Sequence, residues 1–238
     1  MKKIVVLFFA VVMLMGGVQA QKKNVKPISK SPSVSQSMTI SNAKKSVDGL
    51  ESIKLPQPEA GMEMPLRDAL NKRCTVRDLR EEEISPEILS SLLWCAYGFN
   101  RMEEGKRVVP SAVNVQEFDI YVFTKDGVYL YDAKSNVLNA VVAGDYRKMI
   151  SKQKHFAVAP VSIVMVANYD RMKAFKNTED RDFYAAVDAG YISQDIYLFC
   201  SAADLGTVAC GGIDRDTIHK ILNITNGRAI LAHPVGMK

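Results

Sequence analysis

The sequence predicts an α+β fold, and three observations support that class. Phe118, Ile120 and Val122 alternate with more polar neighbours, Asp126-Gly127 follows, and a second apolar run spans 128–131, which is the pattern of a β-hairpin. Helical and strand patterns are mixed along the chain, as in α+β folds. No GxGxxG or P-loop pattern occurs, so the sequence gives no support to a Rossmann-type nucleotide site.

Two helices are predicted before the hairpin. Residues 65–72 form a short helix with Leu66, Ala69 and Leu70 on one side. Residues 85–98 carry the signals of a second: Ser85 caps it, proline and an acid fill its first turn, apolar residues recur at helical spacing, and Gly98 ends it.

The second half of the chain supplies the remaining elements. The apolar run at 159–167 is unbroken, as in a strand covered on both faces. A long helix at 182–205 contains Gly190, which costs about 1 kcal/mol relative to alanine, so we expect a close helix contact there. The other predicted elements are a helix at 145–153, a strand at 207–209, a helix at 214–222 and a final strand at 229–232.

The first twenty residues have the composition of a secretory signal peptide. Lys2 and Lys3 precede an apolar run, and Val18 and Ala20 fit the positions that signal peptidase reads. The alternative is an uncleaved anchor, but the run is shorter than the roughly 20 residues that span a bilayer. We therefore expect residues 1–20 to be removed and the mature chain, from Gln21, to be periplasmic or secreted without stable membrane insertion.

Residues 21–59 are predicted to form a flexible basic arm, followed by one globular domain at 60–238. The arm is rich in Ser, Lys and Pro and lacks an amphipathic period. The net charge is +5, but the signal carries two lysines and residues 21–47 carry six with no acid, so residues 48–238 have a net charge of −3. A nucleic-acid enzyme would carry positive charge on its fold, so that class is disfavoured. The arm is either a solvated spacer or a contact to an anionic membrane surface.

The four cysteines and three histidines show no metal or CxxC spacing. Disulfides are possible in an exported chain, whereas Cys95 and Cys200 lie in apolar helical stretches typical of small core residues. A thiol-based redox function and a zinc site are both disfavoured.

A phosphate-binding pattern follows the first predicted helix. In an extended segment Arg73, Thr75 and Arg77 share a face, so two guanidiniums and a hydroxyl converge, and arginine donates paired, charge-assisted hydrogen bonds to phosphate oxygens. The other interpretation is a solvated basic turn in a highly charged stretch.

Two further segments are rich in small and polar residues. One is Pro110-Ser111-Ala112-Val113-Asn114-Val115-Gln116, and the other is Leu205-Gly206-Thr207 followed by Cys210-Gly211-Gly212. Asn114 offers a donor and an acceptor, and glycines allow the backbone to approach a ligand closely. Taken separately, the first also reads as a polar loop and the second as a helix cap and turn.

In their order and spacing, the three segments resemble the nitroreductase family of flavoenzymes from about Pro65 to the C-terminus. The family's Arg-Arg-Ser-x-Arg signature matches Arg73-Cys74-Thr75-Val76-Arg77, with cysteine at the second arginine, which removes one charge from the phosphate site. The resemblance implies FMN held by Arg73, Cys74, Thr75, Arg77, Pro110, Ser111, Ala112, Asn114, Gly211 and Gly212, with a Gly212 backbone N–H directed at the flavin N5. The chain stops at Lys238, without the basic residues that often follow in this family.

The resemblance also implies a nitroreductase-like fold, with a central, mainly antiparallel sheet flanked by helices and two flavins in an interlocked homodimer. The implied activity is hydride transfer by way of flavin N5, from a reduced nicotinamide or another reductant, to a small acceptor such as a quinone or nitroaromatic. No side chain is assigned as catalytic. A second hypothesis is a secreted flavin-binding protein of the same fold that acts as a sensor or carrier without turnover, and the Cys74 departure slightly favours it.

Overall fold

The structure is a computed structural model that describes residues 46–238. Its centre is a seven-stranded sheet in which every neighbouring pair is antiparallel, so the predicted α+β class with a mainly antiparallel sheet is confirmed. In spatial order its strands are β10 (Leu205–Thr207), β11 (Gly227–Met237), β9 (Val161–Asn168), β6 (Phe118–Phe123), β7 (Gly127–Asp132), β8 (Val137–Ala143) and β3 (Ile53–Lys54). Two small strand pairs are β1 (Ser46–Val47) with β2 (Leu50–Glu51), and β4 (Phe99–Arg101) with β5 (Lys106–Arg107).

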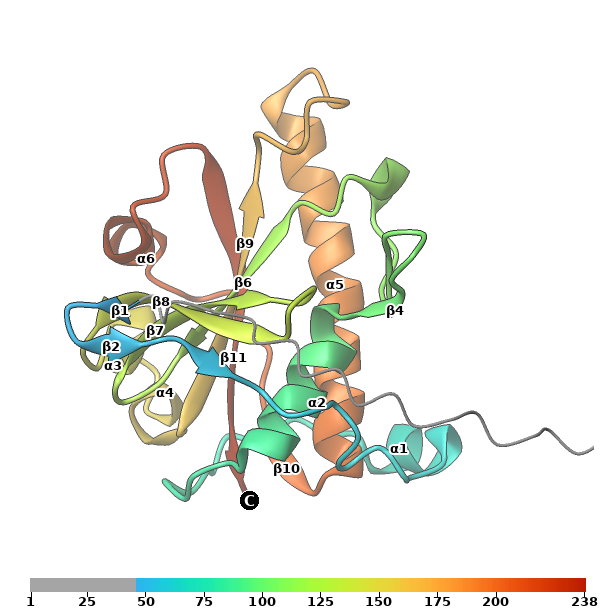
Figure 1. Cartoon of the computed structure of the whole chain (residues 1–238), viewed down its shortest axis with the longest axis vertical. Helices are drawn as coiled ribbons and strands as arrows, with labels where there is room; N and C mark the ends of the chain where they lie inside the picture. The colour runs from blue at the N-terminus through green and yellow to red at the C-terminus, as the bar shows by residue number, and fades with distance from the viewer. Residues whose placement is uncertain (1–45) are drawn as a thin grey trace, which may run out of the picture. The chain divides into compact units, whose positions relative to one another are not determined.

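Helices lie on both sides of the sheet (Figure 1). They are α1 (Leu66–Lys72), α2 (Pro86–Tyr97), α3 (Arg147–Ile150), α4 (His155–Val158), α5 (Thr178–Ala202), α6 (Arg215–Leu222) and the 3-10 turn η1 (Ala112–Asn114). Ser85 caps α2 by accepting a hydrogen bond from the Ile88 amide, as the sequence predicts.

Strand β9 shows how one apolar run serves two cores. Ile163 and Met165 pack with residues of α2 and α5, whereas Val164 and Val166 pack with residues of α3, α4 and α6. Side chains alternate between the faces of a strand, so an unbroken apolar run fits a strand with helices on both sides. The prediction made for this run is confirmed.

The predicted arm overlaps the fold at its C-terminal end. Residues 46–54 form β1, β2 and β3, Ile53 pairs with Leu138 of β8, and Leu50 and Leu55 are buried. Their backbone hydrogen bonds and two leucines hold this polar stretch on the sheet, so the boundary predicted at residue 59 is too late. The predicted signal peptide and residues 21–45 lie outside the described residues.

Three other predicted elements differ in extent. The helix expected at 145–153 is reduced to the single turn α3, because the backbone is extended at Ser151. Helix α5 begins at Thr178, where the Asn177 side chain accepts a hydrogen bond from the Asp180 amide at 2.7 Å. The final strand extends to Met237 because it pairs with both β9 and β10.

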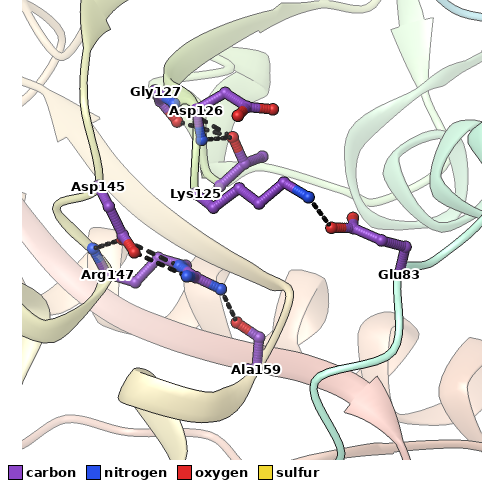
Figure 2. Close-up of polar contacts among 8 residues, drawn as sticks. Glu83, Lys125, Asp126, Gly127, Asp145, Arg147 and Ala159 are labelled. Atoms are coloured by element: carbon purple, nitrogen blue, oxygen red, sulfur yellow. Dashed lines mark hydrogen bonds and ion pairs between the residues drawn. The ribbon is translucent and has the colours of Figure 1, made fainter.

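Side-chain contacts fasten the connection between α1 and α2 to the hairpin turn (Figure 2). Lys125 forms a 2.6 Å ion pair with Glu83. Arg147 forms a 2.7 Å ion pair with Asp145 and donates a hydrogen bond to the Ala159 carbonyl at 2.9 Å. The Lys125–Glu83 pair is exposed, so water screens it and it contributes little to stability. Arg147 is much less exposed and fixes the entry to β9.

All four cysteines are free, and Cys200 is buried as predicted whereas Cys95 is only half-buried. Within residues 46–238, no helix has the length and apolar character needed to cross a membrane.

Candidate functional site

The first and third motifs lie side by side. The segment after α1 has no regular secondary structure and runs along β10 and β11, where the Val76 amide donates to the Thr207 carbonyl and the Arg80 amide donates to the Met237 carbonyl, both at 2.9 Å. Gly206 allows this approach, because a Cβ there would lie 2.6 Å from a Leu79 methyl and 2.8 Å from a Val76 methyl.

Tyr197 of α5 joins the two motifs. Its hydroxyl accepts a hydrogen bond from the Ala209 amide at 2.9 Å and lies 3.1 Å from the Thr75 hydroxyl. The guanidinium carbon of Arg73 lies 5.4 Å from the centre of the Tyr197 ring, within the range of a cation–π contact. One side chain on a rigid helix therefore positions residues from both segments.

The guanidiniums of Arg73 and Arg77 remain available to an anion. No acidic side chain of residues 46–238 forms an ion pair with either of them. Arg77 is exposed and lies close enough to His155 and Cys210 for its positive charge to act on both. Burial and then Arg77 lower the pKa of His155, whereas at Cys210 the charge of Arg77 opposes the rise in pKa that burial causes. The positive charge of Arg77 therefore acts on Cys210, the residue just before the Gly211-Gly212 turn.

The Gly211-Gly212 turn is exposed, and the chain's own packing does not explain its two glycines. A Cβ on Gly211 would come no nearer than 3.7 Å to Leu231, and one on Gly212 no nearer than 3.7 Å to Gln153. Both are ordinary contact distances, and neither glycine has a positive φ. The space that side chains would fill is consistent with close approach of a bound molecule to this backbone, so the turn fits the planar group that the sequence implies.

Cys210, just before that turn, contacts His155 without forming a reactive ion pair. Its Sγ lies 3.5 Å from the His155 Nε2. Burial raises the pKa of the Cys210 thiol and lowers the pKa of His155, so both groups are neutral near pH 7. The pair acts as a packing contact under the turn.

The buried histidine His233 packs against the Tyr197 ring. His233 is 0% exposed, and burial lowers its pKa to about 3, so its ring is neutral. The Thr207 hydroxyl donates to the Pro234 carbonyl and therefore accepts from Nδ1 of His233, which leaves Nε2 to accept from the Ser193 hydroxyl at 2.8 Å. The Tyr197 ring packs edge-on against this imidazole, with the ring centres 5.3 Å apart.

The second motif forms a tight loop on a different part of α5. The Ala112 amide donates to Asp188 at 2.8 Å, and the Ser111 hydroxyl accepts from the Gln116 amide at 3.0 Å. Pro110 and Asn114 are exposed, and Asn114 accepts a hydrogen bond from the Gln116 side chain.

Helix α5 keeps the second motif away from the other two within one chain. Asp188 and Tyr197, which hold the two groups of segments, are nine residues apart, or about 13 Å along the helix axis. Of the predicted residues, Arg73, Cys74, Thr75, Arg77, Gly211 and Gly212 therefore belong to one cluster, and Pro110, Ser111, Ala112 and Asn114 belong to another. Cys74 is exposed at the edge of the first cluster.

Loss of the Tyr197 hydroxyl is expected to loosen this cluster. In Tyr197→Phe the half-buried Ala209 amide loses its acceptor, and because a fully buried unsatisfied donor costs about 1–3 kcal/mol, this one should cost an amount toward the lower end. We expect urea denaturation to show a free energy of unfolding lower by about 1–2 kcal/mol. Tyr184→Phe on the same helix is the matched control, since the Tyr184 ring stacks on Phe175 and no described residue bonds its hydroxyl. Equal stability of the two variants would contradict the role assigned to Tyr197.

Comparison with known proteins identifies the family. The nitroreductase family model matches residues 70–237, and the chain therefore belongs to the nitroreductase family. A Methanocaldococcus jannaschii protein, named provisionally as a nitroreductase, is 33% identical over 197 residues, which are 78% of this chain and 96% of that protein.

Solved structures agree with this assignment. A Ralstonia eutropha crystal structure, also named provisionally as a nitroreductase, has 31% identity and a TM-score of 0.73, and the match covers 78% of this chain and 89% of that one. A Staphylococcus epidermidis structure, named provisionally as an NAD(P)H:FMN oxidoreductase, shares the fold at 14% identity and a TM-score of 0.57, with 76% of this chain and 90% of that one covered.

Sequence reasoning did not identify the residues that position the motifs. Tyr197, Asp188 and His233 stand out in the structure because each bonds a segment distant in sequence. Of these three residues, only Asp188 could have been noticed in the sequence, because it is a charged residue among apolar neighbours in a predicted helix, and such residues are rarely buried without a partner.

Proposed function

We propose that this chain is an exported, FMN-dependent oxidoreductase that transfers hydride by way of flavin N5 to a small acceptor such as a quinone or nitroaromatic. The observation that carries the proposal is a cluster in which Arg73 and Arg77, whose guanidiniums form no ion pair within residues 46–238, share a site with the exposed Gly211-Gly212 turn. Membership of the nitroreductase family supports an oxidoreductase, and the name of the S. epidermidis structure supports FMN and a reduced nicotinamide as donor.

Each part of the cluster has a separate task in this proposal. Arg73 and Arg77 donate charge-assisted hydrogen bonds to the FMN phosphate, and the Thr75 hydroxyl contributes another. The Gly211-Gly212 backbone lies against the ring and orients it for substrate. FMN, when bound, supplies the two-electron redox chemistry, which no side chain of the protein provides. No general acid or nucleophile is assigned.

A homodimer completes the site in this proposal, because one chain holds its two clusters about 13 Å apart along α5. An apolar stripe on α5 supports a second copy as partner. Phe183, Val187 and Tyr191, spaced by four residues, are 61%, 38% and 46% exposed. Gly190 lies beside them, and apart from the backbone of its own helix a Cβ there would meet no atom of the described residues within 4 Å, so the close contact expected from the sequence does not occur among residues 46–238. Contact with the partner's helix would provide it.

The visible spectrum of the purified mature chain tests the proposal. We expect a yellow protein, or one that becomes yellow on addition of FMN, and we expect it to bleach when a reduced nicotinamide is added without oxygen. A colourless protein that does not take up FMN would refute the flavin site. Cys74, exposed where the family has arginine, favours the second hypothesis of a sensor or carrier, for which the yellow colour would persist with every reductant and acceptor tested.

A further inference from the structure

Glu117 is a buried carboxyl group with an unusual environment. It follows the Pro110–Gln116 loop, and its side chain is 0% exposed. Neither of its carboxyl oxygens has a hydrogen-bond partner among residues 46–238. Its main chain is firmly held, since the Glu117 carbonyl accepts from the Asn168 amide at 2.9 Å and from Arg171 at 2.6 Å. An isolated, ionised carboxylate would be very costly at such a position.

A second buried carboxyl group faces it from α5. Asp188 is 3% exposed, and its Oδ2 accepts a hydrogen bond from the Ala112 amide at 2.8 Å. Asp188 and Glu117 interact closely enough for the state of each to affect the pKa of the other. Asp188 therefore bonds the loop to α5 directly, and the Glu117 carboxyl group interacts with Asp188.

The loop held by Asp188 has a strained backbone. Val113, Asn114 and Gln116 have φ values of 44°, 57° and 49°, in the left-handed region that non-glycine residues rarely adopt. Val113 is β-branched, for which this conformation is a marked outlier, and its side chain is 75% exposed, so it gains little by packing. Such a backbone persists only where surrounding contacts hold it. The Asp188–Ala112 bond is one of these contacts.

Three ionisable groups on neighbouring elements interact with Glu117: Tyr97 on α2, Arg171 after β9 and Asp188 on α5. Arg171 is occupied by a 2.7 Å ion pair with Asp119, and the Tyr97 hydroxyl accepts from the Phe118 amide. Because Arg171 is shared with Asp119, the pair has no cation of its own to neutralise a second negative charge.

We propose that Glu117 is protonated beside ionised Asp188, and that the two carboxyl groups, with one negative charge between them, act together as a clamp that holds the strained 110–116 loop on α5. Asp188 carries the negative charge and accepts the hydrogen bond from the Ala112 amide. Protonated Glu117 is neutral, so the buried space holds no second negative charge. Both are positioning residues, because they act through the loop. The clamp stands on the contacts of this chain alone, whereas its purpose, the placement of Ala112 and Asn114 beside the flavin ring, rests on the proposed function.

The clamp should weaken as the pH rises from about 4.5 to about 7. Burial, and then the charge of Asp188, raise the pKa of Glu117 to about 7, and burial also raises the pKa of Asp188. A carboxyl group whose pKa is higher in the closed loop than in the open loop stabilises the closed loop while it is protonated. For Glu117 this stabilisation is complete below the ordinary pKa of 4.5 and is lost as the pH rises to about 7. Above about pH 7 two negative charges share a dry space, and opening the loop relieves them.

Hydrogen exchange of the Ala112 amide in the flavin-free full chain tests the clamp. After correction for intrinsic exchange, we expect protection of this amide to fall on the order of 50-fold between pH 5 and pH 8 in the wild type. Glu117→Gln keeps the size and polarity of the side chain but cannot ionise, so protection of the Ala112 amide in this variant should change less than threefold over that range. Glu103→Gln, on an exposed turn, is the matched control and should follow the wild type. Identical pH profiles for Glu117→Gln and the wild type would overturn the proposal.

A direct titration covers the case in which Glu117→Gln does not fold. Carbon NMR of the Glu117 carboxyl group in the wild-type chain should give a midpoint near 7. A midpoint near 4.5 would overturn the proposal, because the proton would then be absent at neutral pH. Neither measurement needs FMN. A chain that binds no flavin but shows both pH effects would therefore refute the proposed function and support the clamp.

Discussion

Simultaneous replacement of Arg73 and Arg77 by alanine is expected to give a folded protein without flavin absorbance. Hydrogen bonds to charged groups contribute about 1.5–3 kcal/mol each, so loss of both guanidiniums should weaken FMN binding by roughly 100-fold or more. Neither arginine forms an ion pair among the described residues, so their removal should change the midpoint of urea unfolding little. FMN affinity is measured by quenching of flavin fluorescence on titration with protein.

A matched control separates the specific effect from the loss of charge. Arg80→Ala with Arg101→Ala removes the same net charge from exposed positions whose ion pairs, with Glu82 and Glu104, lie on the surface. This control should bind FMN as the wild type does. A full complement of flavin in the Arg73→Ala, Arg77→Ala protein would place the phosphate elsewhere.

Local signals in the sequence were sufficient for most of the fold. Ser85-Pro86 determined where α2 begins, Asp126-Gly127 marked the hairpin turn, and the apolar run in β9 indicated cover on both faces. Each depends on interactions within a few residues or on side-chain alternation, which sequence displays directly. The short strands at 46–54 carry little apolar periodicity, so the pairing of β1 with β2 and of β3 with β8 was not visible.

The candidate site was only partly accessible to the same reasoning. The residues that would contact a ligand belong to short motifs, but Tyr197 and Asp188 act across 122 and 76 residues of sequence. Contacts of that separation depend on how α5 packs against the loops, which no local pattern encodes. The left-handed backbone at Val113 is likewise a product of tertiary contacts, since its residue type opposes it.

Tyr191→Asp is expected to convert the proposed dimer into a monomer that holds little flavin. Tyr191 is 46% exposed beside Phe183 and Val187, and an unpaired charge buried between two such helices would cost several kcal/mol, enough to lower the dimer population by two or more orders of magnitude. Light scattering after gel filtration measures the mass, and absorbance of the same peak measures bound flavin. Ile53→Asp, at a 40% exposed position on the edge strand β3, is the matched control and should remain dimeric and yellow. A monomeric wild type that binds FMN fully would mean that one chain suffices, and the 110–116 loop would then have no part in the site.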